Sequence, residues 1–292
     1  MSWSYPETKH EKASIVEIRV EGLRGGHSGL QIHEGRGNAI KLMTRLLAVC
    51  GEKNAALIDM RGGSARNAIP ARCIARVAVL DEAVFAQNIA EEAEAIRKEF
   101  KRLEPDLQIT TTKLENGPVS TLTAEKQRAL VLALQAVVNG VYRMSPEVPG
   151  LVEASSNLSL IELRRGRAEW SGLQRSSVES SKRDVAAAFA APFRLLGAEV
   201  RNDDGYPGWS PSASSVILDQ MKGIYREIFG HDVGVSACHA GLECGVIAQT
   251  YPGLDMISFG PDIEEAHSEN ERASISSVQK FWKLLTTTLA RL

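Results

Sequence analysis

Two consecutive segments, IVEIRVEGL (Ile15–Leu23) and GNAIKLMTRLLAV (Gly37–Val49), set the architecture of the chain, with a glycine-rich turn between them. The first alternates apolar and polar residues, which is typical of a strand with one buried face. The second places Ile40 and Met43 at helical spacing, and Gly51 follows as a helix-ending signal. We therefore expect a sheet whose first strand leads directly into a packing helix.

The same pattern continues along the chain as far as about residue 205. Strands are expected at Ala56–Arg61, Arg72–Leu80 and Leu107–Lys113, and a helix is expected at Glu82–Leu103. The order β-α-β-β-α-β is that of the ferredoxin-like motif. A second, weakly similar series has helices at Thr123–Asn139 and Ser180–Leu196 and strands at Leu158–Leu163, Ala168–Gln174 and Ala198–Arg201. We interpret residues 15–205 as a doubled ferredoxin-like domain that follows a separate segment, residues 1–14.

A linker rich in Asp, Gly and Pro, Asn202–Pro211, marks the start of a region of different character, residues 206–292. Helices are expected there at Ser212–Phe229, Glu243–Gln249 and Ser274–Leu289, and short apolar strands at Val233–Ala237 and Asp255–Phe259. Two strands are too few for a complete doubly wound domain. The fold class is therefore α+β followed by part of an α/β domain.

The composition is that of a globular protein, with 292 residues, 43% hydrophobic and 24% charged residues, and a net charge of -2. This charge gives no reason to expect nucleic acid or a membrane as partner. The N-terminus lacks the apolar core of a signal peptide, so we expect a cytoplasmic protein. Four scattered cysteines indicate reduced thiols and not a disulfide framework.

Two motifs of the first region contain polar residues next to glycines. GGHSGLQIH (Gly25–His33) places His27 between a strand and a helix, where it could donate a hydrogen bond to a carboxylate or an oxyanion. The alternative is a solvent-exposed histidine of a turn. GGSARNAIP (Gly62–Pro70) places Asn67 before a strand, much as Asn157 stands before one in the second series. The Asn67 amide could bind a substrate carbonyl, or it could simply form the turn.

Two further motifs lie in the second region. In SACHAGLECG (Ser236–Gly245), Cys238, His239 and Cys244 suggest zinc, but the C-x5-C spacing and the lack of a fourth ligand favour thiols beside a ligand-binding loop. That loop suits a carboxylate ligand, although Glu243 could be only a first-turn acid of a helix. GPDIEEAHSENE (Gly260–Glu271) places His267 after an apolar strand, where ligands gather in open α/β sheets.

Together the four motifs carry a resemblance. GGHSG, RNAIP, HAGLECG and GP-x5-HS-x-NE occur in the order and span found in aminoacyl-histidine dipeptidases, the Xaa-His or carnosinase-like dipeptidases. These belong to the co-catalytic zinc peptidase family that also holds peptidase T and carboxypeptidase G. HAGLECG is the most specific of the four. The resemblance extends from about residue 15 to the C-terminus.

The resemblance implies a lid domain at residues 15–205 and the C-terminal part of a metallopeptidase catalytic domain at 206–292. His27 would be the catalytic lid histidine that reaches the scissile carbonyl, and Asn67 would contact substrate. The pocket for the substrate C-terminus would use His239, Gly241 and Glu243. His267 would be a zinc ligand, the only one present of a site that holds two zinc ions. A dipeptide substrate and a homodimer are implied as partners.

The rest of the family's metal site is missing from these 292 residues. The motif H-x-D does not occur after any of the six histidines, which are His10, His27, His33, His231, His239 and His267. Two metal ions need a bridging carboxylate and a general base. We therefore expect a truncated chain that is inactive alone and pairs with itself or with a complementary N-terminal fragment. Two alternatives stay open: a non-catalytic scaffold that dimerises through the lid, and a binding module that uses only the His239 loop.

Overall fold

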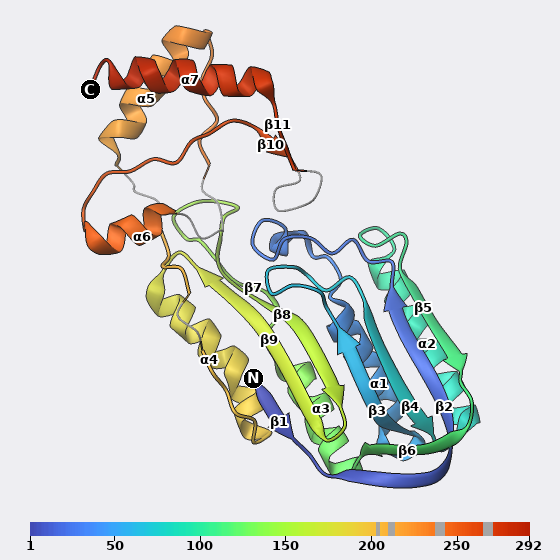
Figure 1. Cartoon of the computed structure of the whole chain (residues 1–292). Helices are drawn as coiled ribbons and strands as arrows, with labels where there is room; N and C mark the ends of the chain where they lie inside the picture. Colours follow the sequence, from blue (N-terminus) through green and yellow to red (C-terminus); the bar gives the residue numbers. More distant parts are fainter. Residues whose placement is uncertain (203–204, 210–213, 237–242, 265–270) are drawn as a thin grey trace. The chain divides into compact units, whose positions relative to one another are not determined.

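The computed structural model describes residues 1–202, 205–209, 214–236, 243–264 and 271–292. These residues form two compact units, Met1–Gly205 and Tyr206–Leu292, and each is considered by itself (Figure 1). Within the described residues, no helix is both long enough and apolar enough to cross a membrane. The structure is a mixed arrangement of helices and strands, dominated by one large sheet.

The large sheet has nine strands and lies entirely in the first unit. Its main order is β1-β9-β8-β3-β4-β2-β5, with β6 paired to β2 and β7 paired to β8. All paired strands are antiparallel. The strands are β1 (Ser2–Ser4), β2 (Glu7–Glu21), β3 (Ala55–Gly62), β4 (Cys73–Val79), β5 (Gln108–Lys113), β6 (Gly117–Leu122), β7 (Gly140–Met144), β8 (Val152–Arg164) and β9 (Arg167–Ser176).

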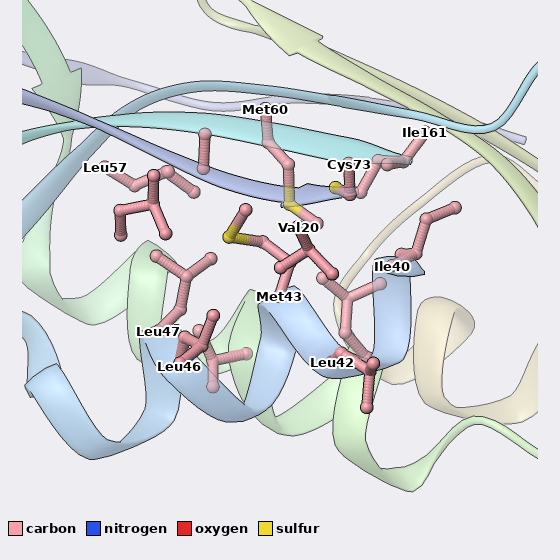
Figure 2. Close-up of a cluster of buried hydrophobic side chains, with 14 of the residues drawn as sticks. Val20, Ile40, Leu42, Met43, Leu46, Leu47, Leu57, Met60, Cys73 and Ile161 are labelled. Carbon is pink, nitrogen blue, oxygen red and sulfur yellow. The ribbon is translucent and has the colours of Figure 1, made fainter. Parts of the chain in front are cut away.

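The first half of this sheet has the element order β2-α1-β3-β4-α2-β5, with α1 at Ala39–Asn54 and α2 at Glu82–Phe100. Asn38 begins α1, because its side chain accepts hydrogen bonds from the amides of Ile40 and Lys41. The apolar face of α1 packs on the strands, and Figure 2 shows its side chains directed at residues of β2 and β3. This packing makes α1 the centre of the core.

The second half differs from a plain repeat of the first. It contains α3 (Ala124–Ala136), β7, β8, β9 and α4 (Glu179–Leu195), and α1 to α4 cover one face of the sheet (Figure 1). Strand β6, which precedes α3, pairs with β2 and not with the second half. The predicted strand Ala198–Arg201 is reduced to a single bridge between Ser2 and Glu199.

The prediction of a separate segment at residues 1–14 is wrong. Strand β1 forms one edge of the sheet by pairing with β9, and β2 begins at Glu7 and pairs there with β6. The sequence ETKHEKA (Glu7–Ala13) is almost wholly polar, so it lacks the apolar alternation from which a strand is recognised. Hydrogen bonds to neighbouring strands stabilise this part of β2, and local sequence does not reveal them.

The second unit contains three helices, α5 (Val216–Phe229), α6 (Glu243–Thr250) and α7 (Ile275–Leu289), in addition to the short strands β10 (Ile263–Glu264) and β11 (Arg272–Ala273). The described residues of the predicted strands Val233–Ala237 and Asp255–Phe259 are not in strands. A buried strand needs a neighbour for its backbone groups. Among the described residues of this unit, only β10 and β11 pair with one another.

Candidate functional site

Two loops at the ends of β2 and β3 lie side by side and are called the paired loops, residues 24–37 and 63–70. The Ser28 amide donates to the Asn67 carbonyl at 2.8 Å, and the Ile69 amide donates to the Gly26 carbonyl at 2.8 Å. Gly26 has a φ of 122°, and a β-carbon there would lie 2.4 Å from Gln31 Oε1. A residue with a side chain would be strained in this backbone conformation. The structure therefore brings the loops of His27 and Asn67 together.

The imidazole of His27 is half-buried and has a defined orientation. Its Nδ1 accepts hydrogen bonds from the amides of Gly29 at 3.2 Å and Leu30 at 3.1 Å. Its own backbone amide donates to Gln31 Oε1 at 2.7 Å. A nitrogen that accepts hydrogen bonds carries no proton, so the proton of the neutral ring is on Nε2. His27 therefore offers an Nε2–H donor, which suits an oxygen that gains negative charge.

The loop that contains His27 is closed at its base by Glu104. This side chain is 2% exposed, and its two oxygens accept from the amide of Arg24 at 2.7 Å and the amide of Gly37 at 2.9 Å. Arg36 adds a bond from Nη1 to the Gly25 carbonyl at 2.7 Å. Sequence reasoning missed Glu104, because no local pattern distinguishes it from a surface acid after a helix.

Asn67, by contrast, is exposed at the tip of the second loop. Its carbonyl accepts from Ser28, whereas the carbonyls on either side of it accept from residues of β8, Arg66 from Ser159 and Ala68 from Asn157. The side chain of Asn67 is thus presented from a backbone that is fixed on both sides. Sequence reasoning placed Asn157 before a strand, but it lies within β8.

The site residues predicted in the second unit are mostly outside the described residues. This holds for His239, Gly241 and His267, and for Cys238. Glu243 is the exposed first residue of α6. Among described residues, no three or more His, Cys, Asp or Glu side chains gather into a metal-binding group. The zinc centre implied by the resemblance would therefore have to use residues beyond this set, His267 among them.

A separate feature lies at the outer edge of the first unit. A groove of about 320 Å³ runs between α2 and β5, the strand at the end of the sheet order. Its lining includes Ala86, Ile89, Ala90, Ala93, Ile109 and Thr111. Small side chains on a helix beside an edge strand allow close approach of another chain.

Residues 18–108, from β2 to the start of β5, match the family described as peptidase dimerisation domain. Cytosol non-specific dipeptidase of Escherichia coli (strain K12) is 35% identical over 276 residues, which are 94% of this chain and 57% of that protein. Aminoacylhistidine dipeptidase from Vibrio alginolyticus has a crystal structure that matches with a TM-score of 0.89 and 34% identity, over 100% of this chain and 60% of that one.

This chain thus spans less than two thirds of the length of either relative. The resemblance to dipeptidases found from the four motifs is confirmed by both relatives. Nearly the whole chain aligns with dipeptidases, so the expectation that it is inactive alone is not maintained.

Proposed function

We propose that the chain is part of a metallodipeptidase of the M20 peptidase family, which hydrolyses Xaa-His or similar dipeptides. In this proposal, residues 15–205 are the lid and residues 206–292 are the C-terminal part of the catalytic domain. His267 would help to hold bound zinc, which would supply an activated water. The observation that supports the proposal best is the pair of amide hydrogen bonds to His27 Nδ1, which orient the ring beside the loop of Asn67.

The two lid residues have separate roles. His27 donates to the oxygen of the scissile carbonyl, where negative charge develops as the tetrahedral intermediate forms. The two amide bonds to Nδ1 hold this donor in place before the substrate arrives. A preorganised donor favours the transition state over the ground state. Asn67 binds a polar group of the dipeptide with its exposed amide.

The second unit contributes the remaining parts of the proposal. His267 is a ligand of the zinc site, which holds two ions when complete. His239, Gly241 and Glu243 line the pocket that receives the C-terminus of the substrate. This assignment is carried over from the motifs HAGLECG and GP-x5-HS-x-NE.

The test is hydrolysis of an Xaa-His dipeptide with added Zn²⁺. The 292-residue chain is assayed alone and joined to the part of the Vibrio alginolyticus enzyme that lies outside the match. We expect turnover of the dipeptide. The substitution His27→Ala should lower kcat about 100- to 1,000-fold. His33→Ala is the matched control, because His33 is exposed on the same loop and should leave kcat unchanged. Absence of turnover from both proteins, with the Vibrio enzyme active, contradicts the proposal.

Self-association of the lid is a second function that the structure supports. The groove between α2 and β5, together with the match to a dimerisation domain, favours a homodimer at this edge. Ala90→Arg would place a long cation in the groove, whereas Gln87→Arg on the same helix lies outside its lining. We expect only Ala90→Arg to shift the mass measured by light scattering from dimer to monomer. A dimeric Ala90→Arg variant would exclude this surface.

A further inference from the structure

Strand β8 contains an unusual run of buried polar residues. Ser155, Ser156 and Asn157 are each 1% exposed, and Ser159 is 0% exposed. Buried positions of a strand are normally apolar, because a buried polar group without a partner is unfavourable. These side chains must therefore have partners that justify their burial.

Two of these residues bond to the second of the paired loops. Asn157 Nδ2 donates to the Ala68 carbonyl at 2.7 Å, and Ser159 Oγ donates to the Arg66 carbonyl at 2.6 Å. Asn157 Nδ2 also donates to Ser159 Oγ at 2.9 Å, which joins the two contacts. The two carbonyls flank Asn67 on both sides. The backbone of Asn67 is thereby held by residues 89 and 93 positions away in sequence.

The geometry of β8 explains how it reaches this loop. The pairing of β8 with β9 shifts register between Leu158 and Leu160, so Ser159 is the extra residue of a bulge. A bulge redirects a side chain away from the regular alternation. The bulge is itself fixed, because Asn139 Oδ1 accepts from the Leu158 amide at 2.9 Å and Asn38 Nδ2 donates to the Leu158 carbonyl at 2.9 Å.

The first of the paired loops is connected to this support. Its Ser28 amide donates to the Asn67 carbonyl, and the Gly26 carbonyl accepts from Ile69. Any displacement of residues 66–68 would therefore be transmitted to the loop of His27. Because a shift of about 1 Å in a reacting group can reduce a rate up to about 100-fold, the support bears on catalysis.

We propose that Asn157 and Ser159 are positioning residues, which hold the backbone around Asn67 and, through it, the loop of His27. This inference rests on the proposed function, since it assigns the second half of the sheet a role in orienting the lid residues. It also explains why Asn157 and Ser159 are polar at buried positions of β8, because packing alone would not require polar side chains there. Ser156 differs, since among the described residues its hydroxyl accepts from Gln174 of β9 at 3.3 Å and not from either of the paired loops.

The test compares Ser159→Ala with Ser156→Ala in the full 292-residue chain. Both variants remove one buried hydroxyl from the same strand, so they have similar packing costs. Amide-resolved hydrogen exchange follows the amides of Ser28 and Ile69, which join the paired loops. We expect about five- to tenfold faster exchange at both amides in Ser159→Ala and unchanged exchange in Ser156→Ala. Equal exchange in the two variants would overturn the proposal.

The catalytic consequence is measured in the dipeptide assay described above. We expect Ser159→Ala to lower kcat about tenfold, and Asn157→Ala to lower it further, with Ser156→Ala within twofold of the parent. Retention of full kcat by Asn157→Ala in an active protein would also overturn the proposal. If the parent shows no turnover, the proposed function fails, whereas the exchange data still decide whether β8 holds the loops.

Discussion

The two units of the chain contain similar proportions of apolar residues but bury them very differently. In Met1–Gly205, one continuous cluster joins buried residues of the sheet and of α1 to α4. In Tyr206–Leu292, the buried apolar cluster of the described residues contains only Met221, Ile224 and Leu284. Ile275 and Trp282 of α7 are 79% and 62% exposed. The first unit is stabilised by its own core, and the second has little core of its own.

The difference shows that an amphipathic pattern does not guarantee burial. Helices α5 and α7 also have an apolar side, and both begin with a serine cap, Ser215 and Ser274. Nevertheless, apolar residues lie on more than one side of α7, and α5 covers only part of them. Helix propensity and caps contribute about 1 kcal/mol each, whereas a large buried side chain contributes about 2–3 kcal/mol. The sheet provides this larger contribution only in the first unit.

Separation of the two units into two fragments should produce the largest change in unfolding behaviour. We expect residues 1–205 to unfold cooperatively in urea at nearly the midpoint of the full chain, because the core cluster lies wholly within them. Residues 206–292 alone should lack a cooperative transition by circular dichroism. A sharp transition in the isolated second fragment would show that its small cluster is sufficient.

Truncation of a core aromatic should have the next largest effect. Phe193 is fully buried and packs against Trp170 and Phe189, with ring centroids 4.7 and 5.7 Å away. Phe193→Ala should lower the free energy of unfolding by about 3–5 kcal/mol in urea melts. Leu284→Ala, the matched change in the second unit, should cost about 2 kcal/mol or less. A larger loss from Leu284→Ala would reverse the comparison.

Glu104→Gln should have an intermediate effect within the first unit. The substitution keeps the shape of the side chain but turns an NH2 group toward one of the amides of Arg24 and Gly37. We expect a loss of about 1–3 kcal/mol in the free energy of unfolding. Gln87→Glu, which also exchanges amide and carboxyl but on an exposed surface, should change it by less than about 0.5 kcal/mol. Similar values for both would mean that Glu104 does not close the loop.

Substitution of Trp282 should have the smallest effect on stability. Its side chain is largely exposed on α7, so Trp282→Gln should change the free energy of unfolding by less than about 0.5 kcal/mol. Binding of an apolar dye should fall, because the exposed apolar surface of α7 shrinks. A loss of stability above about 2 kcal/mol would show that Trp282 is buried in solution.

Thiol reactivity gives an independent check of the same comparison. Burial raises the pKa of the Cys50 thiol to about 12, so its reactive thiolate is scarce at neutral pH. Cys244 of α6 is only half-buried. In a Cys238→Ser background, we expect one thiol to react at once and Cys50 and Cys73 to react only on unfolding. Rapid reaction of all three thiols would contradict a closed core.

Much of the first unit could be predicted from its residues. The alternation in Ile15–Leu23 and the helical spacing after Gly37 specify β2 and α1, and Thr123 begins α3 as expected. Glycines on both sides of His27 marked its loop, and the motif residues identified the family. Each of these signals depends only on residues a few positions apart. Local periodicity and capping are therefore readable from the chain alone.

Other features exist only because distant residues meet. The polar residues of β1 and of the start of β2 form strands because they pair with β9 and β6, respectively. Glu104 closes a loop that begins 80 residues earlier, and Asn157 reaches Ala68 across 89 positions. Strands predicted at Val233 and Asp255 failed because backbone hydrogen bonds need partners that the described residues do not supply. Sequence thus determined the local elements and marked His27 and Asn67 as candidate site residues, and tertiary contacts decided how firmly their loops are held.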